Sequence, residues 1–183
     1  MADEFFPLPL PPTLTDGVIW LDSHTVEDAE AHHAGEDDEM LRRFDSPRKG
    51  RIEEIRGAME RWMGMRAAGG PQFAYALRER AGGVLTGGCE LQRRSADCAH
   101  VSYWLFPAFR GRGYASRALT LLCAAAGKID GLSRLEAHID ADNLASQGVA
   151  ARNGFVRDGL VEDETWAGDV VTRLRYVRTA TAA

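Results

Sequence analysis

The sequence of 183 residues is poor in cysteine and has no long apolar run. Its three cysteines, Cys89, Cys98 and Cys123, form no CxxC pair, which favours reduced thiols over disulfides. No stretch approaches the roughly 18 apolar residues that a membrane span needs. Asp3 and Glu4 stand where a signal peptide carries basic residues. These absences predict a cytoplasmic protein without a membrane partner.

A basic excess is missing as well. The 27 acidic residues outnumber the 22 basic ones, the formal net charge is −5 and the isoelectric point is about 5.6. Because nucleic-acid-binding domains usually carry a basic surface, we expect no nucleic-acid partner. Hydrophobic residues make up 45% of the chain, which suffices for a core without disulfides. The length favours one domain, as a monomer or a homodimer.

The two ends of the chain differ from its middle. Four of the seven prolines, Pro7, Pro9, Pro11 and Pro12, lie in the first dozen residues. Since proline fixes φ and lacks an N–H group, we expect residues 1–17 to form an extended lead-in. Residues 179–183 contain only threonine and alanine, and we expect them to fray. A single domain is therefore predicted over residues 18–178.

Apolar periodicity predicts the elements of this domain. Residues 52–63 carry apolar side chains at helical spacing, and Gly69-Gly70-Pro71 ends that helix. Thr25 is the expected cap of a shorter helix that contains Asp28. Apolar or alternating runs predict strands over residues 18–21, 73–78, 84–92, 101–106, 135–140, 156–161 and 170–177.

The second half of the chain alternates strand and helix. A predicted helix over residues 115–126 separates the strands at 101–106 and 135–140, and another, capped by Asp142 or Asn143, runs to about Arg152. A strand–helix–strand succession places its two strands parallel, joined by a right-handed crossover. The hairpins before it are antiparallel. The sequence therefore predicts an α/β (α+β) fold with a mixed sheet.

A glycine-rich turn, Arg110-Gly-Arg-Gly-Tyr-Ala-Ser116, follows the strand at 101–106 and opens a helix. Exposed amides at a helix start attract anions, Gly111 and Gly113 permit close backbone approach, and Arg110 and Arg112 offer charged donors. An ordinary strand–helix turn remains an equal alternative on these local features alone. Ser116 replaces the third glycine of a dinucleotide fingerprint, and no Gly-Lys-Ser/Thr of a Walker loop exists.

The turn also matches a family signature. Residues Arg110 to Ala115 fit the pattern [QR]-x-x-G-x-[GA], and Tyr103-Trp104-Leu105 with Pro107 precede it. Downstream stand Leu135-Glu136-Ala137, Asp142-Asn143-x-x-Ser146 and Asn153-Gly154-Phe155. In this order the motifs resemble the GNAT superfamily of N-acetyltransferases, in the branch typified by ribosomal-protein-alanine acetyltransferases. His100 and Ser102 depart from the Glu and Gly that this branch often carries.

The resemblance implies a mostly antiparallel central sheet with flanking helices and a splayed parallel strand pair, open between Leu105 and Ile139. It also implies acetyl-CoA as co-substrate, without a metal. The amides of the turn would hold the coenzyme's pyrophosphate, and the backbone of the preceding strand, with Asn143, would hold its pantetheine arm. The implied coenzyme residues are Trp104, Leu105, Phe106, Arg110, Gly111, Arg112, Gly113, Tyr114, Ala115, Ser116 and Asn143.

Transfer to an amine needs a base, because an ammonium cannot attack a thioester. Glu136, which shares a strand face with His138 and Asp140, is the first candidate, against the alternative of a structural carboxylate. His100 is a second candidate base, and the alternative is that it is a surface histidine at the end of its strand. Ser146 is a candidate donor to the leaving thiolate, or a hydroxyl that only bonds the backbone. A strand N–H near Leu105 can bind the oxyanion.

No metal site is expected, because the adjacent His32 and His33 point about 100° apart on a helix.

The acceptor is the least constrained part of the prediction. The segments 36–49 and 162–169, which include Trp166, are acid-rich and are expected to flank a primary amine, either a small molecule or a protein N-terminus. Their charges can equally form a solvated face. Two other functions stay open: a coenzyme-A-binding regulatory or interaction module without turnover, and a dinucleotide-dependent oxidoreductase, which the missing third glycine disfavours.

Overall fold

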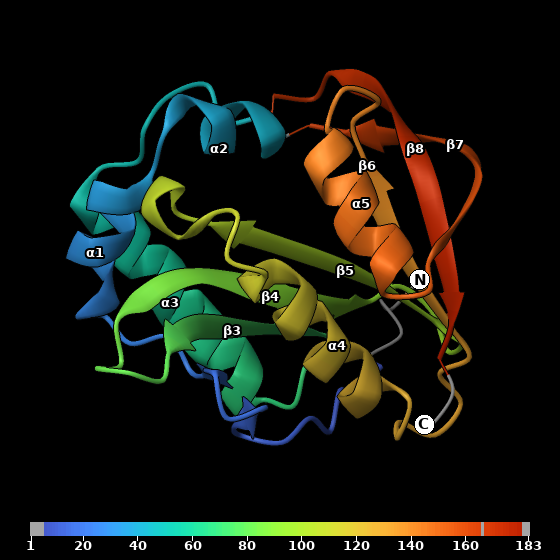
Figure 1. Ribbon diagram of the computed structural model, residues 1–183, viewed down its shortest axis with the longest axis horizontal. Helices are drawn as coiled ribbons and strands as arrows, with labels where there is room; N and C mark the ends of the chain where they lie inside the picture. The colour runs from blue at the N-terminus through green and yellow to red at the C-terminus, as the bar shows by residue number, and fades with distance from the viewer. Residues whose placement is uncertain (1–5, 166, 181–183) are drawn as a thin grey trace.

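The computed structural model describes residues 6–165 and 167–180. Its eight strands form one sheet in the order β1-β2-β3-β4-β5-β6-β8-β7 (Figure 1). The strands are β1 (Leu14–Thr15), β2 (Ile19–Asp22), β3 (Gln72–Glu79), β4 (Leu85–Arg93), β5 (Cys98–Leu105), β6 (Arg134–Ile139), β7 (Val156–Glu164) and β8 (Val170–Thr179). The helices are α1 (Asp28–Gly35), α2 (Asp38–Arg43), α3 (Ile52–Ala67), α4 (Tyr114–Ala126) and α5 (Leu144–Arg152). The predicted mixed sheet is confirmed.

One strand pair runs parallel, as the strand–helix–strand pattern predicts. β5 and β6 are joined by α4 and pair only from Cys98 with Arg134 to His100 with Glu136. Every other neighbouring pair in the sheet is antiparallel. Beyond His100 the two strands diverge, and Figure 1 shows β5 and β6 separating. The expected splay is therefore present.

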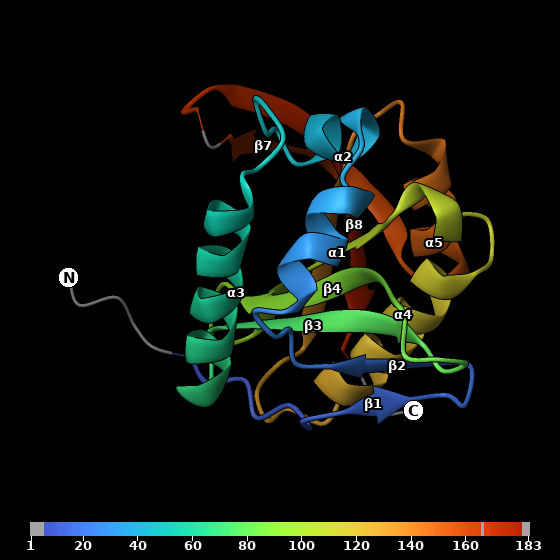
Figure 2. The ribbon, with the colours of Figure 1, turned by 90° about the vertical axis from the view of Figure 1, so that its left-hand side faces the viewer.

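Helices cover both faces of the sheet (Figure 2). α4 lies on one face, where Leu119 and Leu122 are fully buried in the main core. Burying each of these side chains contributes about 2 kcal/mol. α1 and α3 cover the other face, where Ile55 and Met59 of the predicted apolar stripe are buried against Ala29. Within the described chain, no helix combines the length and the apolar character that a membrane span requires.

The ends of the domain are more firmly attached than expected. Leu8 and Leu10 of the proline-rich segment are buried in the main core, and the N–H group of Leu8 donates to the carbonyl of Gly69. Thr179 pairs with Arg134 in the sheet, so the expectation that the tail frays is wrong at this residue. The lead-in and tail therefore belong to the packed domain. Residues 181–183 lie outside the described residues.

Two helix starts differ from the prediction. α2 was not expected, because its residues were interpreted only as part of an acidic run. Its N-cap is Asp37, whose side chain accepts from the N–H group of Met40 at 3.0 Å. In α1 the N-cap residue is Glu27, not Thr25. The backbone carbonyl of Thr25, and not its side chain, accepts a hydrogen bond from the N–H group of Asp28. Short polar runs predict helix starts poorly when a tertiary contact selects the cap.

Candidate active site

A cavity of about 620 Å³ opens where β5 and β6 diverge. This volume is typical of small-molecule sites. The cavity wall is built by α2, β5, the glycine turn, β6, the start of α5 and Arg173 of β8. Ten of the expected site residues line it: His100, Trp104, Leu105, Arg110, Gly111, Gly113, Ala115, Ser116, Asn143 and Ser146. Four do not: Phe106, Arg112, Tyr114 and Glu136.

The glycine turn forms a cradle of free amides at one end of the cavity. Gly111 and Gly113 have φ values of 75° and 80°, the left-handed region that favours glycine, and Gly113 is the N-cap of α4. The first amide of α4 with a backbone acceptor is that of Arg117, which donates to Gly113. No described group meets a Cβ built at either glycine within 4 Å. The turn therefore fits an anionic phosphate group.

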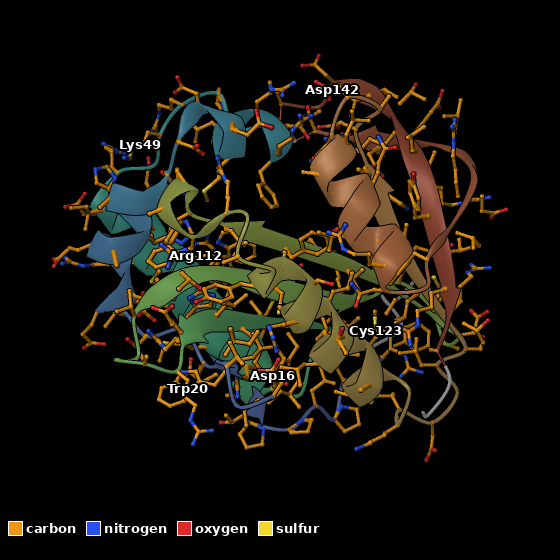
Figure 3. All side chains as sticks on the ribbon, in the orientation of Figure 1. Asp16, Trp20, Lys49, Arg112, Cys123 and Asp142 are labelled. Atoms are coloured by element: carbon orange, nitrogen blue, oxygen red, sulfur yellow. The ribbon has the colours of Figure 1, made fainter. Side chains whose placement is uncertain are left out.

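The guanidinium groups of the two arginines in the turn have partners within the protein. Arg110 donates through its guanidinium to both oxygens of Asp37 at 2.7 and 2.8 Å and through Nε to the carbonyl of Leu105. This contact is the largest cause that lowers the pKa of Asp37. Arg112 lies over the ring of Phe109 and 3.8 Å from Glu79 (Figure 3). Backbone amides, rather than these charged side chains, therefore make the cradle.

Tyr114 also points away from the cavity. Its ring is buried, and its hydroxyl donates to Glu79. Phe106 donates its N–H to Thr86, and its ring is buried against Gly35, where a Cβ would stand 2.4 Å from the ring. Because both backbone groups of Phe106 are already bonded, the expected coenzyme contact of these two residues is reduced to the backbone N–H group of Tyr114.

β5 presents an open backbone edge to the cavity. Past His100 it pairs only with β4, with Trp104 opposite Gly88 and Leu105 opposite Gly87. Because Phe106 donates to Thr86 at the end of β4, alternation directs the N–H group of Leu105 to the opposite, cavity side. An extended ligand can therefore pair with this edge as another strand would.

Trp104 holds its position through a contact that the sequence did not reveal. A Cβ built at Gly88 would stand 2.2 Å from the Trp104 ring, so only glycine admits the ring there. The ring meets Phe44 edge-on at 5.9 Å and Trp62 at 6.0 Å. Trp104 thus joins the sheet to α3 and to the segment after α2. The Gly-Gly pair in the apolar run of β4 was the available signal.

The start of α5 brings two hydroxyl groups together at the cavity. Asn143 is the N-cap, and its side-chain oxygen accepts from the N–H group of Ser146 at 3.0 Å. The hydroxyl of Ser146 lies 2.9 Å from that of Tyr103. Burial raises the pKa of Tyr103 to about 12, so the phenol remains protonated. Tyr103 is a functional candidate that the sequence analysis had named only for its motif.

Glu136, the first candidate base, lies below the cavity where β5 and β6 are still paired. Its carboxylate lies 3.0 Å from Nε of Arg134 and 3.4 Å from Nε2 of His138. His138 lines the cavity, and its Nδ1 lies 2.9 Å from Asp163 of β7. The structure therefore places a histidine between the cavity and Glu136. Asp163 was missed because it comes from a distant strand.

His100 is a poorer base than expected. Burial, and secondarily the nearby His138, lower the pKa of His100 to about 3. Its ring lies 4.7 Å from that of His138, and Nε2 is buried without a described hydrogen-bond partner. The alternative of a surface histidine is wrong too. His100 is therefore a neutral part of the cavity wall at physiological pH.

The far end of the cavity holds an ion-pair cluster. Asp140 lies 2.8 Å from Arg43 of α2 and 3.0 Å from Arg173, and these arginines reach further carboxylates on neighbouring elements. The cluster comprises five carboxylates and three guanidiniums: Glu39, Asp45, Asp140, Asp142, Asp163, Arg42, Arg43 and Arg173. Asp142, labelled in Figure 3, lies on the loop that meets α2. The carboxylates of the cluster are therefore all paired, and they outnumber its guanidiniums. Trp166 lies outside the described residues.

No metal centre is found in the part of the chain that the structure describes, since no group of three or more potential ligands gathers there. His32 contacts Glu36 at 3.4 Å, whereas His33 contacts the carbonyl of Gly50 at 2.9 Å. The two rings thus have separate partners, in line with their expected divergence on the helix.

Known proteins share this architecture. Residues 19–156 match the acetyltransferase (GNAT) domain. A RimL ribosomal L7/L12 alpha-N-protein acetyltransferase in complex with coenzyme A is 20% identical, with 97% of this chain and 100% of that chain covered and a TM-score of 0.79. The microcin C7 self-immunity acetyltransferase MccE in complex with acetyl-CoA and AMP is 18% identical over 90% and 93%, with a TM-score of 0.78.

A GNAT-family acetyltransferase from Bacillus anthracis is 16% identical, with 92% of this chain and 98% of that chain covered and a TM-score of 0.78. No curated protein gives a significant match to the sequence. The matched domain spans most of the chain and contains both the glycine turn and the diverging strands. The chain therefore belongs to the GNAT acetyltransferase family and is an acetyltransferase that uses acetyl-CoA.

Proposed function

We propose that the protein transfers the acetyl group of acetyl-CoA to a primary amine by direct attack. The observation that carries this proposal is the shape of the cavity between β5 and β6. One end is a cradle of free amides, and the other is a cluster with excess negative charge, which attracts an ammonium group. The open edge of β5 connects the two ends.

At the first end, the amides from Gly111 to Ser116 bind the pyrophosphate of the coenzyme. Leu105 pairs through its backbone with the pantetheine arm, Trp104 lies next to it in the cavity wall, and Asn143 borders it from α5. Acetyl-CoA supplies an activated thioester carbonyl. The N–H group of Leu105, which points away from β4, donates to the oxygen of that carbonyl as negative charge develops on it.

The protons balance as follows. The acceptor arrives as an ammonium and loses one proton before its nitrogen bonds to the carbonyl carbon, and a second as the amide forms. The C–S bond breaks, and the thiolate takes one proton from the hydroxyl of Ser146, which Tyr103 can replenish at 2.9 Å. The second proton of the amine restores this hydroxyl pair. One proton is released to solvent. Glu136 is the proposed final acceptor of the amine's first proton.

The nature of the amine is not fixed by these contacts. One of the similar structures is a ribosomal L7/L12 alpha-N-protein acetyltransferase, and another is a self-immunity acetyltransferase bound to AMP. A test panel must therefore include both a protein N-terminus and small amines. The alternative of a coenzyme-binding module without turnover has no use for a charged acceptor end.

Two measurements test the proposal. Thermal unfolding with acetyl-CoA, CoA, NAD and NADP should show stabilisation by the first two only, about 2.7 kcal/mol at 100 times the dissociation constant. A chelator should leave this shift unchanged. Mass spectrometry should then detect an acetylated product from a lysine-free peptide with a free α-amine or from putrescine. Coenzyme binding without acetylation of any amine would favour the module instead.

A further inference from the structure

We infer that His138 takes the proton from the acceptor amine, and that Asp163 positions its imidazole for this step. This assignment rests on the proposed function and deepens it. It names the group through which the proton passes from the cavity to Glu136.

The position of His138 is the first argument. His138 is among the residues that line the cavity between the diverging strands, whereas Glu136 is not. Nε2 of His138 lies 3.4 Å from the Glu136 carboxylate. A proton that leaves an amine in the cavity therefore meets His138 before it meets Glu136.

The orientation of the ring is the second argument. Nδ1 lies 2.9 and 3.1 Å from the two oxygens of Asp163. Because a carboxylate only accepts, and a neutral imidazole has one N–H group, that group belongs on Nδ1, at the shorter contact. The lone pair then stands on Nε2, ready to take a proton. Asp163 is itself held 3.3 Å from Arg173, so the pair is anchored across β6, β7 and β8.

The charges around His138 are the third argument. Charged and titratable groups near His138 come from four strands and one loop: Glu136 on β6, Asp140 directly after β6, His100 on β5, Asp163 on β7, and Arg173 and Arg175 on β8. Arg175 forms an ion pair with Asp158 at 2.9 Å, and Arg173 forms ion pairs with three carboxylates. His100 remains neutral. An imidazolium at position 138 thus lies between two carboxylates.

Glu90 is the competing base. Burial raises its pKa, and it stands opposite Ser102, a residue of the cavity wall. However, Glu90 does not line the cavity itself. We therefore do not assign the base to Glu90, and we use the variant Glu90→Gln to distinguish the two candidates.

The experiment compares His138→Gln, Asp163→Asn and Glu90→Gln with wild type. The control is His33→Gln, whose ring bonds the carbonyl of Gly50 away from the cavity. Acetylation of the panel amine, the peptide or putrescine, is measured from pH 6 to pH 10 with saturating acetyl-CoA. Coenzyme affinity and thermal unfolding are measured for each variant. Those two readouts separate a catalytic loss from misfolding.

We expect His138→Gln to lower kcat about 10²–10⁴-fold at pH 7, with coenzyme affinity unchanged. Its rate should recover as the pH approaches the pKa of the amine, about 8 for an α-amine and 10.4 for an alkylamine. Asp163→Asn should lower kcat less and move the acidic limb of the kcat profile to lower pH, because a neutral amide stabilises the imidazolium less. A purely structural Asp163 would change stability without moving that limb.

The outcomes are distinguishable. If wild type acetylates neither amine, the proposed function fails and the assignment of His138 fails with it. If wild type is active and folded His138→Gln keeps its pH profile, only the assignment fails. If the acidic limb of the kcat profile is lost only in Glu90→Gln, Glu90 is the base instead of His138. If His138→Gln does not fold, the Asp163→Asn variant makes the test: an acidic limb of the kcat profile at lower pH than in wild type supports the assignment, and an unmoved limb contradicts it.

Discussion

The hydroxyl oxygens of Tyr103 and Ser146 lie 2.9 Å apart where β5 faces the start of α5. This pair links the strand beside the thioester site to the helix that Asn143 caps. A proton lost from Ser146 can be replaced from Tyr103, whose raised pKa of about 12 keeps it protonated. We propose that this pair supplies a proton to the leaving thiolate.

Replacing Ser146 with Ala should lower kcat about 10- to 100-fold without weakening acetyl-CoA binding, because the donor to the thiolate is lost. Steady-state kinetics and calorimetric titration with CoA provide the two readouts. Tyr103→Phe is the matched variant: it keeps the Ser146 hydroxyl and should lose less. Equal activity of Ser146→Ala and wild type would remove Ser146 from the reaction.

Gly113→Val should abolish coenzyme binding in a folded protein. At φ 80° a β-branched residue is strained, and its side chain would occupy the open space over the helix start. The control is Gly154→Val, since Gly154 has φ 78°, has equally open surroundings and does not line the cavity. The control should lose similar stability yet bind acetyl-CoA, as thermal shift would show. Normal affinity in Gly113→Val would refute the amide cradle.

Glu136→Gln should lower kcat about 10²–10⁴-fold, with recovery at high pH, if Glu136 is the final proton acceptor. Coenzyme affinity should not change, since Glu136 does not line the cavity. A pH–rate profile from pH 6 to pH 9 makes the test. Joint loss of stability and binding, without rescue at high pH, would assign Glu136 a structural role with Arg134.

His24 should make the protein sensitive to mild acid. Burial lowers the pKa of His24 to about 3 in the folded state, whereas the unfolded chain takes the proton near pH 6.5. Below about pH 6.5 the unfolded state therefore binds more protons, and stability falls by up to about 1.4 kcal/mol per pH unit. Urea unfolding of His24→Phe at pH 7 and 5.5 should show a smaller acid loss than wild type. The same loss in both would contradict the buried neutral histidine.

Gly88→Ala should displace Trp104 from the cavity wall. The added Cβ would overlap the indole, and overpacking of this kind typically costs about 1–3 kcal/mol. Amine KM should rise more than the KM for acetyl-CoA, because the Trp104 ring contacts Phe44 near the acceptor end. Gly64→Ala, in open space on α3, is the control. An unchanged amine KM would mean that the ring does not shape the acceptor site.

Local sequence determines much of this fold. The strand–helix–strand order predicted the parallel pair, and the turn around Gly113 predicted the anion cradle, because both depend on neighbouring residues. The proline-rich segment was harder to predict, since the burial of Leu8 depends on Gly69, far along the chain. The same holds for α2, whose cap Asp37 is selected by Arg110.

The candidate site was predictable on its coenzyme side and less so on its acceptor side. The cradle is continuous in sequence. The acceptor end joins α2, β6, β7 and β8 through Arg43, Asp140, Asp163 and Arg173. Periodicity carries no information about which of these charges meet. The partner of His138 therefore required three-dimensional contacts, whereas the shared face of Glu136 and His138 did not.

Asp37 serves two structures at once, because one carboxylate caps α2 and also receives both guanidinium donors of Arg110. We therefore expect a change at position 37 to alter both coenzyme binding and acceptor recognition. The exposed residues of α2 do not combine a helix cap with an ion pair to the glycine turn. Engineering of a new acceptor preference should therefore begin at Phe44, directly after α2, and keep Asp37, which links α2 to the glycine turn.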